Sequence, residues 1–205
     1  MKPITFWKKQ SPTLESMYLR ADVSHVDTLE RQEILSLLPS FENKLVLDLG
    51  AGIGRFTKEF AKKAEQVTAV DAIEKFTQAN REYNRSFQNI VYCTANVMDL
   101  LLHEKSYDFI FINWLFMYLE DAEVETLALR LKFWLKPGGI LFFRESCAAT
   151  HTLKKEVYPV HYRSLSFYHR ILDPLFTLLD SGSIQTHIDH YANPFQCYWL
   201  YKKSG

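Results

Sequence analysis

Three glycines and the acidic residue before them form the most distinctive chemical motif in the sequence. Asp48 lies near the end of a short apolar run that is typical of a buried strand, and the run leads directly into Gly50, Gly52 and Gly54. Because glycine has no Cβ, such a turn can bend sharply and come close to a ligand. A helical pattern opens at Arg55, so free N–H groups and a positive dipole end face the turn. The motif predicts a ligand-binding turn between a strand and a helix.

A second acidic residue indicates what this turn binds. Asp71 ends the apolar run 67–70 and lies 21 residues beyond Gly50, a distance that suits an acid holding the hydroxyls of a ribose. The spacing is G-x-G-x-G, not the dinucleotide fingerprint G-x-G-x-x-G, and the carboxylate of Asp48 would repel a pyrophosphate but attract an ammonium group. S-adenosylmethionine (SAM) carries an ammonium group, a ribose and a sulfonium, so we predict a SAM site. The alternative is a glycine-rich turn that binds no ligand.

The composition is that of an ordinary globular protein. The 205 residues are 47% hydrophobic and have a formal net charge of zero. A balanced charge argues against a partner that is duplex nucleic acid or an anionic membrane surface, because both require a positive field. No apolar run is long enough to span a membrane, and the first residues lack a secretory signal pattern. Three widely spaced cysteines predict neither a disulfide framework nor a metal site, so we expect a cytoplasmic protein.

Apolar runs that alternate with helical patterns predict an α/β fold with a mostly parallel sheet. The expected strands are 45–49, 67–70, 90–93, 107–112 and 140–144, and the expected helices are 27–38, 55–64, 73–84, 120–135 and 164–172. Two further strand-like runs, 184–188 and 196–202, have no helix between them. We therefore expect seven strands with an antiparallel end and helices on both faces. A turn is expected at 136–139, and Asp27-x-x-Glu30 indicates a capping box.

The chain is expected to form one domain over residues 1–205. No internal repeat or low-complexity linker divides the sequence. Residues 1–40 show weak helical spacing and are predicted to form a lid over the cofactor, and residues 41–205 are predicted to form the core.

Further polar residues follow the predicted strands. Ligands of doubly wound sheets bind beyond the carboxyl ends of the strands, so Asn96 and Asn113 are expected close to the two acids. Glu145 follows another strand, and we interpret it as a paired surface acid. The predicted cofactor-binding residues are Asp48, Gly50, Gly52, Gly54, Arg55, Asp71, Ala72, Asn96, Val97 and Asn113.

Four runs together resemble a known family. They are Gly50–Thr57 (GAGIGRFT), Asn113–Leu119 (NWLFMYL), Phe142–Cys147 (FFRESC) and His161–Arg163 (HYR). The glycine run is common to many SAM enzymes. The other three are far more specific and resemble the first methyltransferase domain of the phosphoethanolamine N-methyltransferases of plants and nematodes. The segment around Met17 and residues 193–199 are also similar, so the resemblance spans nearly the whole chain.

The resemblance implies the Rossmann-like fold of class I methyltransferases. It further implies SAM-dependent methylation of the amine of a phosphobase, above all phosphoethanolamine, towards phosphocholine, with S-adenosylhomocysteine (SAH) as the other product. The glycine motif would bind the methionine part of SAM and Asp71 the ribose. Tyr118 falls at an active-site position, and Tyr162 and Arg163 fall in the phosphate-binding segment. Asn96 stands where the family usually has Asp. The plant enzymes have a second methyltransferase domain, so a second domain or chain is a possible partner.

Methyl transfer to nitrogen requires the neutral amine. An amine of this kind titrates near 10, so a group that accepts its proton is needed at neutral pH. Tyr118, His161 and Tyr18 are the candidate catalytic residues. We predict that Tyr118 positions the amine and that His161 is the base, because histidine titrates near neutral pH.

The phosphate and the cationic groups of the ligands need other partners. The guanidinium of Arg163 could hold a phosphate bidentately, and the hydroxyls of Tyr162 and Tyr168 could donate to it. Trp114 could form an aromatic wall beside a sulfonium or a methylated ammonium. Aligning the reacting groups and excluding water would suffice for the reaction, so no metal is required.

Two alternative functions remain open. Phe6-Trp7-Lys8 and the glycine motif also resemble the protein N-terminal α-amine methyltransferases, but those enzymes place paired aspartates after the fifth strand, where this chain has Lys154-Lys155-Glu156. The second alternative is a catalytically silent SAM-binding domain that acts as a partner of another methyltransferase chain.

Overall fold

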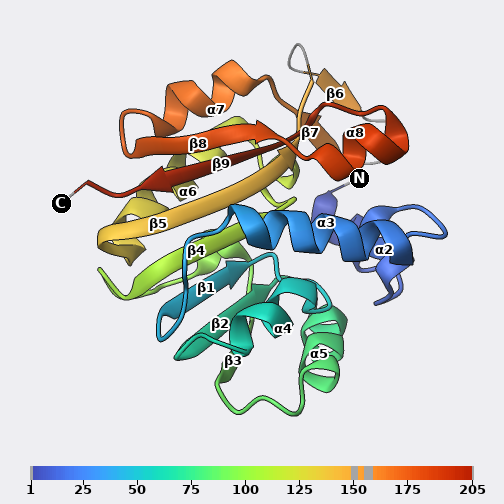
Figure 1. Cartoon of the computed structure of the whole chain (residues 1–205), viewed down its shortest axis with the longest axis horizontal. Helices are drawn as coiled ribbons and strands as arrows, with labels where there is room; N and C mark the ends of the chain where they lie inside the picture. The colour runs from blue at the N-terminus through green and yellow to red at the C-terminus, as the bar shows by residue number, and fades with distance from the viewer. Residues whose placement is uncertain (1, 149–151, 155–158, 205) are drawn as a thin grey trace.

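A seven-stranded sheet runs through the protein (Figure 1). The computed structural model describes residues 2–148, 152–154 and 159–204. The strand order is β3-β2-β1-β4-β5-β9-β8. Its strands are β1 (Leu45–Leu49), β2 (Gln66–Asp71), β3 (Ile90–Thr94), β4 (Tyr107–Asn113), β5 (Leu135–Ser146), β8 (Thr177–Ser183) and β9 (Gln196–Lys202). The first five are mutually parallel, and β9 is antiparallel to β5 and to β8. In a separate two-stranded sheet, β6 (Thr152–Lys154) pairs antiparallel with β7 (Val160–Tyr162).

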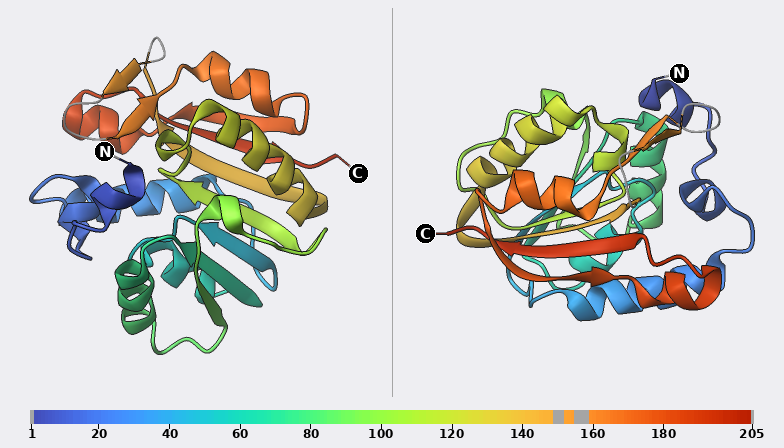
Figure 2. Two further views of the ribbon diagram at one scale, coloured as in Figure 1. Left: turned by 180° about the vertical axis from the view of Figure 1, so that it is seen from behind. Right: turned by 90° about the horizontal axis from the view of Figure 1, so that it is seen from above.

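Helices cover both faces of the sheet. They are α1 (Pro3–Trp7), α2 (Leu14–Tyr18), α3 (Ser24–Leu37), α4 (Arg55–Ala61), α5 (Glu74–Tyr83), α6 (Asp121–Trp134), α7 (Leu165–Leu172) and α8 (Gln185–Tyr191), with two short 3-10 helices, η1 (Val97–Asp99) and η2 (Phe116–Tyr118). In Figure 1, α3 and α4 lie across the face toward the viewer, and the left view of Figure 2 shows α6 and α7 on the opposite face.

The central strands are buried on both sides, as the continuous apolar runs predict for a parallel sheet. Side chains alternate along β4: Phe109 and Phe111 pack with α3 and α4, and Ile110 and Ile112 pack with α6 and α7. Phe111 stacks on Phe142 of β5 with ring centroids 5.4 Å apart. The seven-stranded sheet, its antiparallel end and the helices on both faces therefore confirm the predicted fold class. No helix within the described part of the chain is long and apolar enough to cross a membrane.

The strand prediction at residues 184–188 is wrong. This segment forms the start of α8, and the seventh strand is β8, which the sequence analysis missed. The carboxylate of Glu33 on α3 caps α8 by accepting hydrogen bonds from the N–H groups of Gln185 (2.6 Å) and Thr186 (2.8 Å). This cap satisfies two N–H groups at the start of α8 and stabilises the segment as a helix instead of a strand, and it comes from a residue that is distant in the sequence.

Two local predictions also require correction. The expected turn at 136–139 lies inside β5, where the register shifts from Tyr107↔Leu135 to Phe109↔Ile140 and Gly138 has a φ of +74°. The extra residues form an irregularity in a continuous strand. The capping box expected at Asp27 and Glu30 is wrong, because α3 begins earlier, at Ser24, and both acids are buried within it.

We predict that Gly54 tolerates no side chain, whereas Gly138 does. Both residues have positive φ, so alanine costs about 1–2 kcal/mol at either position. A Cβ on Gly54 would lie 2.1 Å from Oδ1 of buried Asn80, but a Cβ on Gly138 would meet nothing closer than 3.9 Å. Overpacking adds about 1–3 kcal/mol, so Gly54→Ala should lose clearly more free energy of unfolding than Gly138→Ala in urea titrations. Equal losses would contradict this packing argument.

Candidate functional site

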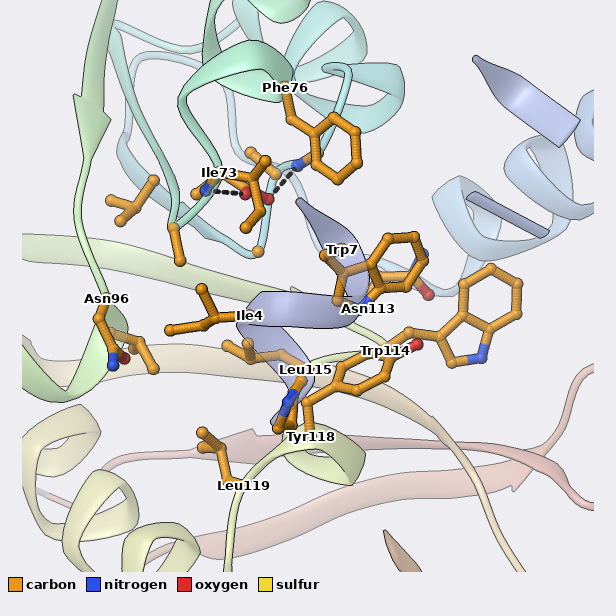
Figure 3. A pocket seen from close by; sticks show the side chains of 18 of the residues that line it. Ile4, Trp7, Ile73, Phe76, Asn96, Asn113, Trp114, Leu115, Tyr118 and Leu119 are labelled. Carbon is orange, nitrogen blue, oxygen red and sulfur yellow. Dashed lines mark hydrogen bonds between the residues drawn. The ribbon is translucent and has the colours of Figure 1, made fainter. Parts of the chain in front are cut away.

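A cavity of about 560 Å³ opens at the carboxyl ends of the parallel strands. It lies where the strand order reverses between β1 and β4, which is the position at which doubly wound sheets bind ligands. Nine of the ten predicted cofactor residues line it: Asp48, Gly50, Gly52, Arg55, Asp71, Ala72, Asn96, Val97 and Asn113. Gly54 does not line the cavity; it is the N-cap of α4. Helix α1 covers the cavity with Ile4 and Trp7 (Figure 3).

The second acid, Asp71, fixes the glycine turn by hydrogen bonding to its backbone. Asp71 accepts hydrogen bonds from the N–H of Gly52 (2.9 Å) and from the N–H of Ile73 (2.8 Å). Gly50 and Gly52 have φ values of +72° and +54°, which favour glycine. Burial raises the pKa of Asp71 to about 6. Asp71 therefore joins the ends of β1 and β2, with its carboxylate at the cavity wall.

Asp48 is oriented by a chain of buried polar groups. Its Oδ2 accepts a hydrogen bond from Thr57 of α4 (2.6 Å), and Thr57 in turn accepts one from Asn80 of α5 (3.1 Å). Asn84 donates to Asn80 (2.8 Å) and to the carbonyl of Gly54 (3.2 Å). Burial raises the pKa of Asp48 to about 7. A cationic group placed beside this carboxylate would favour its ionised form.

The far end of the cavity is formed by Asn96 and Val97. The side chain of Asn96 accepts a hydrogen bond from the N–H of Met98 (3.0 Å) and caps η1. Val97 is buried, and Ile73 and Phe76 lie on the neighbouring wall. The apolar side chains at this end suit a heteroaromatic base.

Aromatic residues form the wall nearest to η2. Trp7 and Tyr118 meet edge to face with ring centroids 5.5 Å apart, and Trp114 lies beside them (Figure 3). Trp114 has a φ of +58°, a left-handed conformation that costs free energy for a bulky residue. Its ring lies 3.6 Å from the guanidinium of Arg144, and its indole N–H donates to Gln196 (2.9 Å). These contacts hold the aromatic wall in place.

Arg55 is tied to helix α3 by Asp27 and Glu30, two buried acids for which the sequence analysis predicted only a capping box. It donates to Asp27 (2.5 Å), to Glu30 (3.2 Å) and to the hydroxyl of Tyr18 (2.7 Å). Although burial opposes ionisation of Glu30, Arg144 (2.8 Å) and its other basic neighbours hold the pKa of that carboxyl well below its usual value. His187 of α8 also contacts Glu30. Three elements distant from α3 in the sequence, namely α4, β5 and α8, therefore meet at the carboxylate of Glu30.

The structure places Tyr18 outside the residues that line the cavity. Its hydroxyl donates to Glu30 (3.0 Å), and its ring packs against Trp114 with centroids 5.4 Å apart. Burial raises the pKa of Tyr18 well above its usual value. A hydroxyl that is bound in this way is unsuited to accept a proton at neutral pH.

The predicted phosphate residues do not gather at the cavity. Arg163 is fully buried, and its guanidinium donates to backbone carbonyls and to Asp121. Tyr168 is fully buried in the core beside Phe143, and Tyr162 is half-buried on β7. The geometry therefore does not favour the expected substrate contacts of Arg163 and Tyr168.

His161 lies close to the cavity rim. Its Nε2 is 3.5 Å from a carboxylate oxygen of Glu120, and Glu120 lines the cavity. Glu123, Lys2 and Met17 also line it, and the sequence analysis did not select them. Their positions depend on how α1, α2 and α6 pack, so no local motif identifies them.

The interpretation of Glu145 as a surface acid is wrong. The residue is fully buried at the end of β5, and its carboxylate accepts three backbone hydrogen bonds from the loop after β4. Burial raises its pKa to about 7. Its position at the end of a predicted strand was the only sequence signal that it lies near the site. Its burial could not be deduced, because glutamate is usually exposed.

Comparisons with known proteins agree with the resemblance seen in the sequence. A family model described as a methyltransferase domain matches residues 46–139. The chain is 42% identical to a phosphoethanolamine N-methyltransferase of Triticum aestivum over 97% of its length. It is 37% identical to the solved structure of Haemonchus contortus phosphoethanolamine N-methyltransferase 1 in complex with phosphoethanolamine and SAH, with a TM-score of 0.92 over 98% of the chain.

These matches cover only part of the relatives. The chain spans less than half of their length, namely 42% of the wheat protein and 48% of the nematode chain. It is also 29% identical to N-terminal Xaa-Pro-Lys N-methyltransferase 1 of Ailuropoda melanoleuca, over 84% of this chain and 81% of that protein. Both kinds of relative are N-methyltransferases by name.

We predict that SAH binds more weakly below pH 7 because of Asp48. A ligand ammonium favours the ionised carboxylate, so a protonated Asp48 must lose its proton on binding. With a pKa of about 7, this makes affinity on the order of tenfold weaker at pH 6 than at pH 7.5. Asp48→Asn should bind more weakly at pH 7.5 and retain about a twofold dependence, from Asp71 with its pKa of about 6. Isothermal titration calorimetry measures both.

The exposed acid Asp189 on α8 provides a matched control. Asp189→Asn should leave the pH dependence of SAH binding unchanged. An unaltered pH dependence in Asp48→Asn would show that another group is responsible.

Proposed function

We propose that the chain belongs to the phosphoethanolamine N-methyltransferase family and that it transfers a methyl group from SAM to the amine of a phosphobase. Phosphoethanolamine is the acceptor that we propose. The products would be its N-methylated form and SAH, and repeated methylation of the amine leads to phosphocholine. The observation that carries the proposal is the cavity itself: an acid and a glycine turn at one strand end, a second acid at the next, and an aromatic wall opposite.

The residues of the cavity fit SAM. When bound, SAM supplies a methyl carbon activated by a positive sulfonium. We assign the ammonium group to the side of Asp48, the ribose hydroxyls to Asp71, and the adenine to the end formed by Asn96 and Val97. The N–H groups at Gly50 and Gly52 would approach the methionine part closely because no Cβ intervenes.

Tyr118 is the residue that we assign to the acceptor amine. It lies on the aromatic wall with Trp7 and Trp114, and aromatic faces attract a sulfonium or a methylated ammonium. Holding the amine in line with the methyl carbon and excluding water would account for most of the rate enhancement. Removing the proton from the ammonium form costs about 4 kcal/mol at pH 7, so a proton acceptor is still required.

We assign the role of proton acceptor to His161, together with Glu120. Glu120 lines the cavity and lies 3.5 Å from His161, so a proton can leave through the rim without crossing the core. Tyr18 serves differently in this proposal: its hydroxyl holds Arg55 and Glu30 together. For the phosphate, Tyr162 remains a predicted partner, and Lys2 is a basic residue at the cavity.

The proposal extends to the setting of the reaction. Residues 1–40 would act as a lid, because Ile4, Trp7 and Met17 already line the cavity from this segment. We also propose a cytoplasmic location. As a partner we propose a second methyltransferase domain or chain, since the matched relatives are more than twice as long as the matched region.

The reaction is tested with labelled SAM and two acceptors. We expect label to enter phosphoethanolamine and not a peptide with a free amino-terminal Xaa-Pro-Lys sequence. Transfer to the peptide alone would overturn the proposed acceptor. Transfer to neither acceptor, with SAH binding intact, would favour a silent SAM-binding domain.

Tyr118→Phe tests the role of the hydroxyl. The ring and its contact with Trp7 remain, so SAH affinity should change little, but kcat should fall by about 100-fold if the hydroxyl positions or deprotonates the amine. The matched control is Tyr83→Phe, which alters an exposed tyrosine on α5. Equal kcat values in the two variants would show that the Tyr118 hydroxyl has no part in the reaction.

A further inference from the structure

The loop after β4 carries Tyr118, the residue that we assign to the acceptor amine, but it has little regular structure of its own. Its η2 turn is only three residues long, Phe116–Tyr118, and follows Trp114, which has a positive φ. So short a helix leaves most of its backbone N–H and C=O groups without partners inside the turn. Leu115, Tyr118 and Leu119 nevertheless line the cavity, so the position of this loop fixes the wall.

Glu145 binds the donors of this loop. One carboxylate oxygen accepts hydrogen bonds from the N–H groups of Leu115 (2.8 Å) and Phe116 (2.7 Å), and the other accepts one from Met117 (3.2 Å). The side chain is fully buried and does not line the cavity in the described part of the chain. Three N–H groups directed at one carboxylate stabilise the buried charge.

Arg163 binds the acceptors of the same loop. Its guanidinium donates to the carbonyls of Phe116 (2.8 Å) and Leu119 (2.5 Å), and its Nε donates to Asp121 (2.8 Å) at the first turn of α6. Arg163 is also fully buried. Its carbonyl accepts a hydrogen bond from the N–H of Ala148 (3.1 Å), which ties Arg163 to the segment that follows β5.

The two charged residues act on the loop from behind the wall. Tyr168 of α7 packs under Phe116 with ring centroids 6.0 Å apart and fills the space beneath the turn. Leu115, on the other side, would lie 3.5 Å from a Cβ on Gly50. The loop is therefore held between the glycine turn and the core, and its polar backbone groups are bound by one buried acid and one buried base.

We infer that Glu145 and Arg163 are positioning residues that hold Tyr118 in place for methyl transfer without contacting either ligand. The inference deepens the proposed function and rests on it for the reaction that is assayed. It replaces the expected phosphate contact of Arg163 with a different role. Because an arginine fork binds two carbonyls and a carboxylate at once, lysine cannot reproduce the contact.

The test uses Glu145→Gln and Arg163→Lys, which preserve approximate size and are the mildest changes to each contact. For each variant we expect kcat to fall by 10- to 100-fold, with the KM for phosphoethanolamine and the Kd for SAH within about threefold of the unaltered protein. Hydrogen exchange should become faster at the amides of residues 115–117 and remain unchanged in β1 and β4. The matched control is the exposed pair on α6 and α7, altered as Glu125→Gln and Arg170→Lys.

Three results would overturn the inference. A rise in KM for phosphoethanolamine with kcat unchanged would restore a phosphate contact for Arg163. Faster exchange throughout the protein would indicate a general role in stability, and unchanged exchange in residues 115–117 would show that neither residue orders the loop. If the unaltered protein methylates no phosphobase, the proposed function fails, but the exchange and SAH measurements still decide whether these residues hold the loop.

Discussion

Buried charges that must be paired fix the geometry of the cavity. Glu30 is fully buried, and it contacts Arg55 at the cavity wall, Arg144 beneath Trp114, and His187 on α8. Removing one partner of a buried ion pair leaves an uncompensated charge, which typically costs 3–5 kcal/mol. The helices that bring these residues together therefore cannot move independently of the wall. The same constraint acts behind η2, where a buried acid and a buried base bind the backbone.

The arrangement of the residues that we assign to the cofactor could be predicted because its signals are local. Asp48 and the glycines lie within one strand–turn–helix unit, and Asp71 ends the next strand, so sequence order alone brings them together. The burial of β4 and β5 on both faces likewise follows from their continuous apolar runs. The motifs around Glu145 and Arg163 are specific to the family that the sequence resembles, and their contacts support the positioning role that we infer.

The rest could not be predicted because the deciding partners are distant in the sequence. Glu30 and Arg144 are 114 positions apart, and a short Asp-x-x-Glu pattern also suits a helix cap. Residues 184–188 place isoleucines four apart, a spacing that fits a helix or one face of a strand, and the cap from Glu33 decides between them. Strand β8 contains Asp, Ser and Gly and is mostly exposed, so it lacks an apolar signal.

This division explains how one framework can serve different acceptors. The residues that we assign to the cofactor lie in a compact motif. The wall that we assign to the acceptor is assembled from α1, η2 and α6 and is supported by Glu145 of β5 and by Arg163, which follows β7. Relatives named for phosphoethanolamine and for a protein amino terminus both match this chain. Both acceptors present an amine, and the acids Glu120 and Glu123 at the cavity suit either one. On the proposed function, discrimination would arise at the end of the acceptor away from the amine, where a phosphate needs cationic or hydroxyl partners and a peptide does not.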